Sequence, residues 1–364
     1  MKVLVIGGTR YFGKIVVRIL LGRGDEVTLF TRGRSQPAFW KQVRHIGGDR
    51  TDQADFGAKL RGGEFDAVID NVAYKREDVE SAIRALRGRI GKYVFTSTVS
   101  VYGGPGHAAQ SRTSATAGEP AHLFEAVPLD DCCPIREDDL DLSRFDYSYP
   151  DGIQEYAVGK RHCEKLLEES PDFPSVRIRV PPVMGPEDPT NRIWFYIQRI
   201  RDGGPIILPN GGWNVFRNMY SADVAKAVVA AVDRGVAGNA YNIAQDEIMT
   251  LRRLIQAIGR AAGGKGQTVD IPTEILEGAG FPYHDWGYDP FSRPPCYLMS
   301  IEKAKAHLGM TSTPQDDWLR TTVEWYRGTY AGGDSAHYNL REREVAFARD
   351  YATEFADFAR RRLA

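Results

Sequence analysis

The sequence is poor in cysteine and carries almost no net charge. Its 364 residues include four cysteines, with no Cys-x-x-Cys pair and no histidine at zinc-finger spacing, so neither a disulfide framework nor a metal site is expected. The 47 basic and 48 acidic side chains leave a net charge of −1, which provides no overall field for holding a nucleic acid or an anionic membrane. We therefore expect no metal, no nucleic-acid partner and no membrane partner.

Long apolar runs are also missing. The apolar stretch at residues 3–6 is short and runs directly into Gly7 and Gly8, which excludes a secretory signal, and no uninterrupted apolar segment approaches the length of a membrane span. The expected location is therefore the cytoplasm. Because 42% of the residues are apolar, the chain can still bury a large core and form two lobes.

Strand and helix patterns alternate along the chain. Apolar runs predict strands at residues 3–6, 26–30, 45–49, 65–70, 92–96 and 175–180. Apolar residues at helical spacing predict helices at residues 15–20, 79–86, 156–167, 223–232 and 251–262. Strands that alternate with helices indicate a parallel sheet covered on both faces, hence an α/β fold.

A glycine-containing turn joins the first strand to the first helix. It consists of residues 7–13, GGTRYFG. Such a turn directs backbone N–H groups at an anion on the helix N-terminus, for example the pyrophosphate of a dinucleotide. Gly7 permits the tight turn, and Gly13 lets the helix pack closely on the strand. The predicted cofactor contacts of this turn are Gly7, Thr9, Arg10, Tyr11, Phe12 and Gly13.

Arg10 stands where dinucleotide-binding turns usually carry their central glycine. A side chain at this position cannot point into the pyrophosphate without a clash. We therefore expect it to lie along the outside of the turn, where its guanidinium could reach a cofactor phosphate.

The end of the second strand bears on the choice between NAD and NADP. An acidic side chain there would accept hydrogen bonds from the ribose 2′-OH of NAD, but the segment carries Thr31, Arg32 and Arg34, which could surround a 2′-phosphate. NADP is therefore favoured over NAD as the cofactor. Asp49 and Arg50 lie where the third strand ends, beside the expected place of the adenine, and both are predicted cofactor contacts. The Asp49 carboxylate could accept a hydrogen bond from the adenine amino group.

These patterns predict a Rossmann-type doubly wound parallel sheet with a smaller C-terminal substrate lobe. Residues 1–180 and 213–248 are expected to form the NAD(P)-binding domain, and residues 181–212 and 249–330 the substrate lobe. Residues 104–150, rich in Gly, Pro, Ser, Ala and Asp, are expected to be an insertion or lid.

The C-terminal extension, residues 331–364, is expected to be helical. It carries an apolar stripe at helical spacing, formed by Phe347, Tyr351, Phe355 and Phe358. The stripe is expected either to pack against its own substrate lobe or to form a subunit contact in a homodimer.

Three side chains have the chemistry that carbonyl reduction requires. Tyr156 and Lys160 are four residues apart, which places both on one face of a helix. A phenol with an ordinary pKa of about 10 becomes a useful proton donor near neutrality when an adjacent ammonium group favours its anion. Thr98, at the end of the fifth strand, could hydrogen-bond the same substrate oxygen. We predict these three as the catalytic residues.

Together the motifs resemble the extended short-chain dehydrogenase/reductases of the NAD-dependent epimerase/dehydratase type. The resemblance runs from Met1 to about Arg327 and includes the segments TSTVSVYG at 96–103, PPVMGP at 181–186 and YNIA at 241–244. It implies an enzyme with a small-molecule substrate, and it implies that Thr98, Tyr156 and Lys160 form the active-site triad. The further cofactor contacts that we predict are Asn71, Val72, Ala73, Thr96, Tyr156, Lys160, Pro181 and Val183.

Departures from the family pattern reduce the number of reactions that are expected for this chain. Val99 and Ser100 stand where the sugar-nucleotide 4,6-dehydratases carry Asp-Glu, so dehydration is disfavoured. Ser100 also stands where members that epimerise carbons beside a ketone often have cysteine. Two reactions stay open, namely oxidation and re-reduction of one hydroxyl with inversion, and a single net ketone reduction. A catalytically silent nucleotide- or RNA-binding role, as in atypical members of the family, is the alternative from another class.

The expected substrate is sugar-like, with a nucleotide sugar as one candidate. Pro182 and Phe216 stand where the nucleotide-sugar enzymes tend to carry asparagine and arginine, and an arginine is displaced by one position to Arg217. The predicted substrate contacts are Ser100, Trp194, Arg217 and Arg293.

Overall fold

The computed structural model describes residues 1–102, 134–144, 156–281 and 298–363. Its larger part is a seven-stranded sheet in the order β11-β6-β5-β4-β1-β2-β3, and its strands pair in parallel. The strands are β1 (Lys2–Ile6), β2 (Glu26–Thr31), β3 (Arg44–Gly47), β4 (Phe65–Asp70), β5 (Ile90–Thr98), β6 (Ser175–Val180) and β11 (Ala240–Asn242). The predicted Rossmann-type fold is confirmed. The strand order reverses between β1 and β4, which is the switch point where open α/β sheets bind ligands, in the crevice outside the carboxyl ends of the strands.

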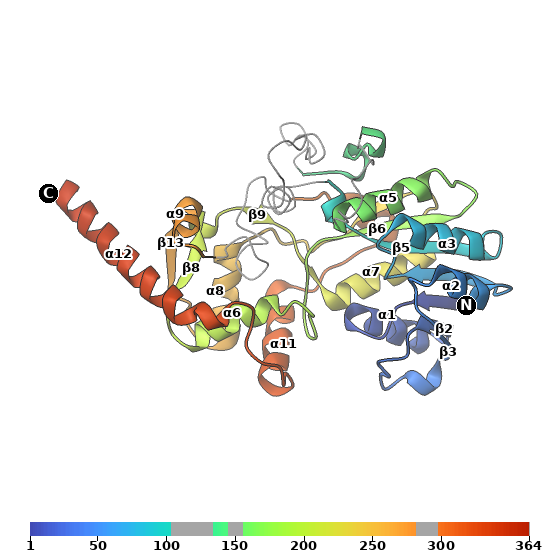
Figure 1. Ribbon diagram of the computed structural model, residues 1–364, viewed down its shortest axis with the longest axis horizontal. Coiled ribbons are helices and arrows are strands. Elements are labelled where there is room, and N and C mark those ends of the chain that lie inside the picture. The colour runs from blue at the N-terminus through green and yellow to red at the C-terminus, as the bar shows by residue number, and fades with distance from the viewer. Residues whose placement is uncertain (103–133, 145–155, 282–297, 364) are drawn as a thin grey trace.

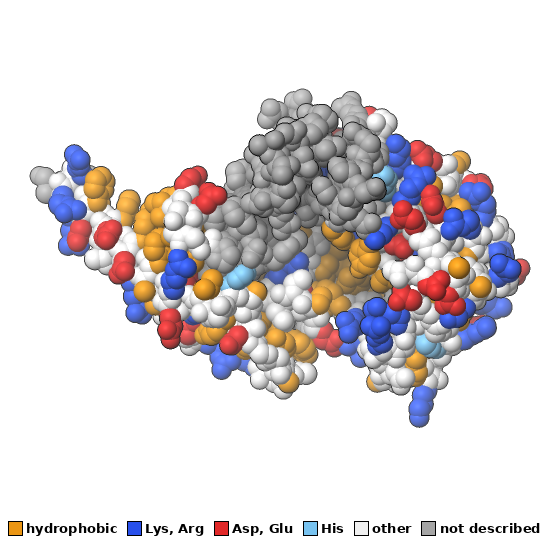
Figure 2. Space-filling view, in the orientation of Figure 1, with side chains coloured by type: hydrophobic (Ala, Val, Ile, Leu, Met, Phe, Trp, Pro, Cys, Tyr) orange, Lys and Arg blue, Asp and Glu red, His pale blue; other side chains and the backbone are white. Residues whose placement is uncertain are grey.

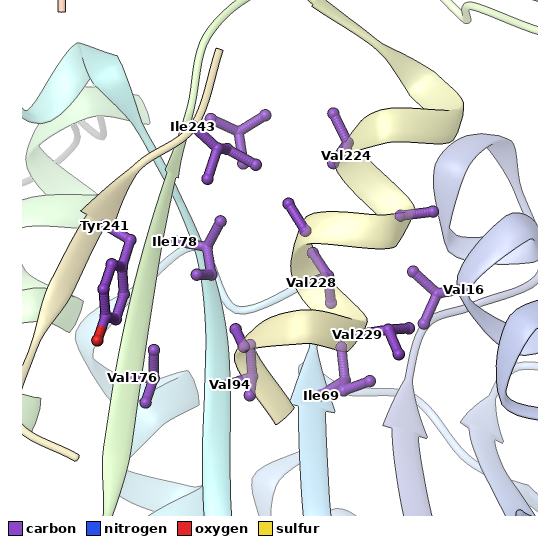
Figure 3. Packing of buried hydrophobic residues seen from close by; sticks show 14 of the residues in the cluster. Val16, Ile69, Val94, Val176, Ile178, Val224, Val228, Val229, Tyr241 and Ile243 are labelled. Carbon is purple, nitrogen blue, oxygen red and sulfur yellow. The ribbon is translucent and has the colours of Figure 1, made fainter. Parts of the chain in front are cut away.

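Helices cover both faces of the sheet (Figure 1). One face carries α1 (Tyr11–Gly22) and α7 (Ser221–Arg234), and the other carries α2 (Gln53–Leu60), α3 (Arg76–Leu86) and α5 (Tyr156–Glu168). Figure 3 shows Val224, Val228 and Val229 of α7 directed at the sheet, where Ile69, Val94 and Ile178 lie. Apolar residues at helical spacing on α7 thus meet the apolar face of the strands, which removes both from water.

The smaller part of the molecule has its own apolar cluster. Its elements are β8 (Ile206–Pro209), β9 (Val215–Phe216), β12 (Met249–Thr250), β13 (Thr268–Ile271), α6 (Arg192–Arg201), α8 (Leu251–Ala262), α9 (Thr273–Gly278), α11 (Gln315–Gly328) and α12 (Arg341–Leu363). The short strands β7 (Val183–Met184) and β10 (Met219–Tyr220) pair with each other, and α10 (Glu302–Leu308) packs beside α7 and β11. The sequence patterns did not predict these short strands, because each is too short to show a period.

A buried ion pair fixes α5 on the sheet. Glu164 of α5 and Arg179 of β6 meet at 2.7 Å, and both side chains are almost inaccessible to solvent. The Ser97 hydroxyl donates to Glu164, while Arg179 Nη1 donates to the Tyr102 hydroxyl and to the Glu137 carbonyl. Since the remaining polar atoms of the pair are largely hydrogen-bonded, this ionic contact holds the helix in a defined position.

Most of the predicted insertion at 104–150 lies outside the described residues. Within residues 134–144, Glu137 is buried and its carboxylate accepts a hydrogen bond from the Asn242 backbone N–H at 2.7 Å. This segment is therefore packed against β11. Its role as a lid stays a prediction.

The apolar stripe of the C-terminal helix packs only in part. Phe347 and Tyr351 lie against the smaller apolar cluster, whereas Phe355 and Phe358 are 60% and 52% exposed. The first half of α12 thus packs against the smaller part of its own chain. Among the described residues, no helix is both long enough and apolar enough to span a membrane.

Candidate active site

The turn after β1 has the geometry of an anion-binding turn. Gly7 and Gly8 have φ values of 95° and 91°, which side-chain-bearing residues rarely adopt. A Cβ atom on Gly13 would lie 3.0 Å from the Gly8 Cα atom, so the start of α1 packs directly on the turn. The first turn of α1 contains no acidic residue, and Arg10 provides no side-chain cap. Backbone N–H groups at this helix N-terminus are therefore suited to a phosphate.

The side chains of this turn lie on different sides of it. Arg10 is exposed and extended, with φ −136°, and its contact with a cofactor phosphate stays a prediction. The positive φ belongs instead to its neighbour Tyr11, at 48°. Burial raises the pKa of the Tyr11 phenol well above its ordinary value, and the negative charge of Asp188 raises it further. Thr9 and Phe12 are partly buried beside it.

Two arginines and a carboxylate lie at the end of β2 and β3. Arg32 and Asp49 approach to 3.9 Å. Hydrogen bonds from the Thr51 N–H and hydroxyl lower the pKa of Asp49, and the charges of Arg32 and Arg34 lower it further. The Thr31 hydroxyl contacts His45 Nε2 at 3.0 Å and accepts from the Gly33 N–H. His45 was not predicted as a site residue, because the apolar pattern of β3 does not show that its side chain contacts Thr31 at the end of β2.

Arg50, expected beside the cofactor, points the other way. Its guanidinium is buried, donates to Asp70 at 3.1 Å and to the Ser81 hydroxyl at 2.7 Å, and lies 4.1 Å from the Phe56 ring centroid. The prediction for Arg50 was wrong. The adjacent residue, Asp49, faces the surface. Arg50 turns inward because its guanidinium pairs with the buried carboxylate of Asp70.

The loop after β4 connects this buried network to the site. Asp70 accepts hydrogen bonds from Arg50, the Tyr93 hydroxyl and the Val72 N–H, so the loop that contains Asn71, Val72 and Ala73 starts from a fixed point. Asn71 Oδ1 accepts from the Thr96 hydroxyl at 2.7 Å. Asn71 Nδ2 is buried beside Gly13 and has no hydrogen-bond partner among the described residues. An unsatisfied buried donor next to an anion-binding turn fits a bound dinucleotide.

The three predicted catalytic side chains come together at the carboxyl ends of the strands. Tyr156, the first residue of α5, lies close enough to Thr98, the last residue of β5, for the two side chains to interact. Lys160 lies one helical turn further along α5, with its Nζ atom 5.8 Å from the Tyr156 ring centroid. Its ammonium group donates to the Ala73 carbonyl at 2.8 Å and to the Thr96 carbonyl at 2.6 Å. Lys160 thus joins the loop after β4 to the end of β5.

The pKa values of the pair differ from the sequence-based expectation. Burial of the ammonium group lowers the pKa of Lys160 from 10.5 to about 8, so the group is still mainly cationic at neutral pH. Desolvation raises the pKa of Tyr156 to about 12 although 45% of the residue's surface is exposed, and the Thr98 side chain only partly opposes this rise. We expected Lys160 to lower the pKa of the phenol. In the structure the groups that shift the pKa of Tyr156 do not include Lys160, and desolvation is the largest effect.

A second tyrosine, Tyr74, stands beside the pair. Its ring centroid lies 4.7 Å from Lys160 Nζ and 6.1 Å from the Tyr156 ring, and 46% of its surface is exposed. A Cβ atom on Gly159 of α5 would overlap the Tyr74 carbonyl oxygen, so the helix packs on this loop through a glycine. Tyr74 was not predicted as a site residue from the sequence. Its position directly after Asn71-Val72-Ala73, at the end of a central strand, was the available signal.

The predicted substrate contacts are placed less uniformly. Ser100 is buried, and its hydroxyl lies 3.2 Å from the Thr98 hydroxyl. The predicted cofactor contacts Pro181 and Val183 follow β6 at the same edge of the sheet. Arg217 donates to the Met299 carbonyl at 2.6 Å. Trp194 is buried in an aromatic cluster, stacked on Tyr326, so the prediction that it contacts substrate was wrong. Arg293 lies outside the described residues.

The family model that matches the chain describes the NAD dependent epimerase/dehydratase family and covers residues 3–126 and 133–244. The protein belongs to this family. The predicted membership is therefore confirmed, and the family assignment agrees with an enzyme of the extended short-chain dehydrogenase/reductase type.

Three relatives illustrate the range of the family. The chain is 27% identical to the chloroplast stem-loop binding protein of 41 kDa b of Arabidopsis thaliana, over 90% of this chain and 80% of that protein. It is 24% identical to a UDP-glucose 4-epimerase of Corynebacterium glutamicum, over 93% and 98% of the two chains. The crystal structure of the Thermus thermophilus UDP-glucose 4-epimerase in complex with NAD superposes with a TM-score of 0.63, at 22% identity, over 91% of this chain and all of that one.

Proposed function

We propose that the protein is an NAD(P)-dependent epimerase or oxidoreductase that acts on a hydroxyl or ketone of a sugar-like substrate. The observation that carries this proposal is the juxtaposition of Tyr156, Thr98 and Lys160 at the edge of the sheet where the glycine turn also lies. Substrates of α/β folds bind in this crevice. The similarity to a UDP-glucose 4-epimerase over nearly the whole chain supports a nucleotide sugar as one candidate substrate.

The chain's own residues divide the work of such a reaction. A bound nicotinamide would supply the site that accepts or donates hydride. Tyr156 holds a proton at its hydroxyl, since its pKa of about 12 keeps the phenol neutral, and can donate it to a carbonyl oxygen. Thr98 orients the same oxygen by hydrogen bonding. The Lys160 ammonium, held by two carbonyl groups, provides the positive charge that favours proton removal from Tyr156 in the opposite direction.

Residues expected to hold the dinucleotide follow from the same geometry. The turn around Gly7 and Gly13 would accept the pyrophosphate, and Asn71 Nδ2 would find an acceptor on the bound molecule. Arg32 and Arg34 favour a 2′-phosphate and hence NADP, because no acidic residue ends β2. Titrations of NAD and NADP test this preference. In the double variant Arg32→Ala/Arg34→Ala, NADP should bind at least about tenfold more weakly and NAD about as before; equal weakening of both would contradict the assignment.

The decisive experiment compares Tyr156→Phe with the wild-type protein. Nucleotide sugars and simple ketones are offered in turn, and turnover is followed by product analysis and by the absorbance of reduced nicotinamide. Removal of the hydroxyl should lower the rate by about 10²-fold or more while cofactor binding is kept. Tyr351→Phe, on α12, is the matched control. Wild-type rates in Tyr156→Phe would exclude the mechanism.

Cofactor consumption separates the two reactions that stay open. An epimerase returns the cofactor unchanged and turns over with catalytic amounts, whereas a reductase consumes one reduced cofactor for each product. Both depend on Tyr156, so the variant tests the shared step.

A second candidate is a nucleotide- or RNA-binding role without turnover. The similarity to a chloroplast stem-loop binding protein over 90% of the chain favours it. Tight, salt-dependent binding of an RNA stem-loop, together with no activity on any substrate offered, would support this role over the proposed one.

A further inference from the structure

The outer half of α12 projects from the body of the molecule (Figure 1). It continues the apolar stripe of the inner half, but here the stripe faces solvent, with Phe355 60% and Phe358 52% exposed. The Tyr351 and Phe355 rings are stacked, with centroids 6.1 Å apart and planes within 10°. Figure 2 shows apolar and basic side chains together on this projecting helix. We call residues 351–362 the arm.

The inner half of α12 fixes the direction of the arm. Arg199 of α6 and Glu344 of α12 form a fully buried ion pair at 2.9 Å. Arg341 adds an ion pair with Glu344 at 2.9 Å and one with Asp202 at 2.8 Å. A buried network of this kind is lost only at high cost, so the helix leaves the body at a set angle. A partner therefore meets a pre-organised surface, which reduces the entropic cost of binding.

The charges beside the stripe are arranged self-complementarily. Asp350, Glu354 and Arg361 are separated by four and seven residues, so they line one side of the stripe. If two arms lie antiparallel about a two-fold axis midway between Phe355 and Phe358, the same side of each helix faces its copy. Arg361 of one copy then lies at a level between Asp350 and Glu354 of the other, within reach of both.

We propose that the arm pairs with the arm of a second copy of the chain in an antiparallel, two-fold symmetric contact centred on Phe355 and Phe358. An isologous contact of this kind needs one surface that complements itself, and the apolar stripe with its acidic and basic flank is such a surface. Asp350 and Glu354 beside the stripe offset the arginines at residues 360–362, so the flank carries both signs of charge and not the uniformly basic face that favours an anionic membrane. The proposal is independent of the catalytic function.

The test is the oligomeric state of the full chain, measured by sedimentation or by size exclusion with light scattering over a wide range of concentrations. The wild-type protein should dimerise. The double variant Phe355→Ser/Phe358→Ser should raise the dimer dissociation constant by at least about 30-fold, because two central apolar anchors are lost. Val236→Ser is the matched control, since Val236 is 52% exposed but lies outside α12. Thermal unfolding of each variant shows that the body is intact.

Charge reversal tests the antiparallel arrangement separately. Arg361→Glu should weaken the dimer, because it places like charges between Asp350 and Glu354 of the copy. The triple variant Asp350→Arg/Glu354→Arg/Arg361→Glu should restore it, since the charges are complementary again. A wild-type chain that stays monomeric, a dimer unaffected by the phenylalanine substitutions, or a triple variant no better than Arg361→Glu would overturn the proposal. Binding of the full chain, as a monomer, to anionic phospholipid vesicles through the arm would overturn the proposal as well.

Discussion

The buried ammonium group of Lys160 makes the stability of the fold depend on pH. Its pKa is about 8 in the folded chain and 10.5 when solvated, so between these values the folded state binds fewer protons than the unfolded state. The free energy of unfolding therefore rises with pH in this window. Below about pH 8 the cost of burying the charge is fully present, and near the upper value it is relieved.

The expected size follows from the two pKa values. A change of one in pKa corresponds to about 1.4 kcal/mol, so relief of the buried charge amounts to about 3 kcal/mol. The variant Lys160→Met has a side chain of similar length that never ionises. The free energy of unfolding of the wild type, minus that of the variant, should therefore rise by about 3 kcal/mol between neutral pH and about pH 10.5.

The assay is denaturant unfolding of both proteins across this pH range. Other titrating groups are present in both chains, so their contributions cancel in the difference. The loss of the two hydrogen bonds to Ala73 and Thr96 lowers the stability of Lys160→Met by the same amount at every pH and does not change the slope. A difference that stays constant with pH, or that falls as pH rises, would refute the argument that desolvation dominates at Lys160.

Two further predictions concern the elements that position the site. Arg50→Met should lower the free energy of unfolding by about 3 kcal/mol, because Asp70 is left buried without its cation; denaturant unfolding checks this, and a loss below about 1 kcal/mol would contradict it. Gly13→Ala should weaken dinucleotide binding at least about tenfold, since its Cβ atom would press on the Gly8 backbone. Gly22→Ala, at the other end of α1 where nothing lies within 4 Å, is the control in the same calorimetric titration. Equal affinities in the two glycine variants would count against the turn as the binding site.

Local patterns were sufficient for the larger part of the fold. Strands buried on both faces appear as continuous apolar runs, so β1, β4, β5 and β6 could be placed within a few residues. The pairing of Tyr156 with Lys160 followed from helical spacing alone. The short strands of the smaller part could not be predicted in this way, because two to four residues carry no period.

The direction of side chains at the ends of strands could not be predicted from the sequence. Asp49 and Arg50 are adjacent, yet one faces the surface and the other enters the core, because the partners of Arg50 come from β4 and α3. Trp194 looked like a pocket residue from its type, but it stacks on Tyr326 of α11, far along the chain.

The sequence by itself determined the succession of strands and helices along the chain, the glycine turn and the spacing of Tyr156 and Lys160. Each of these depends on neighbours within a few residues. Only the tertiary structure decided the pKa of Tyr156 and Lys160, the approach of Tyr74 and the exposure of the outer half of α12. The physical reason is that desolvation and burial depend on which distant segments pack around a group. The chain's local pattern does not contain that information.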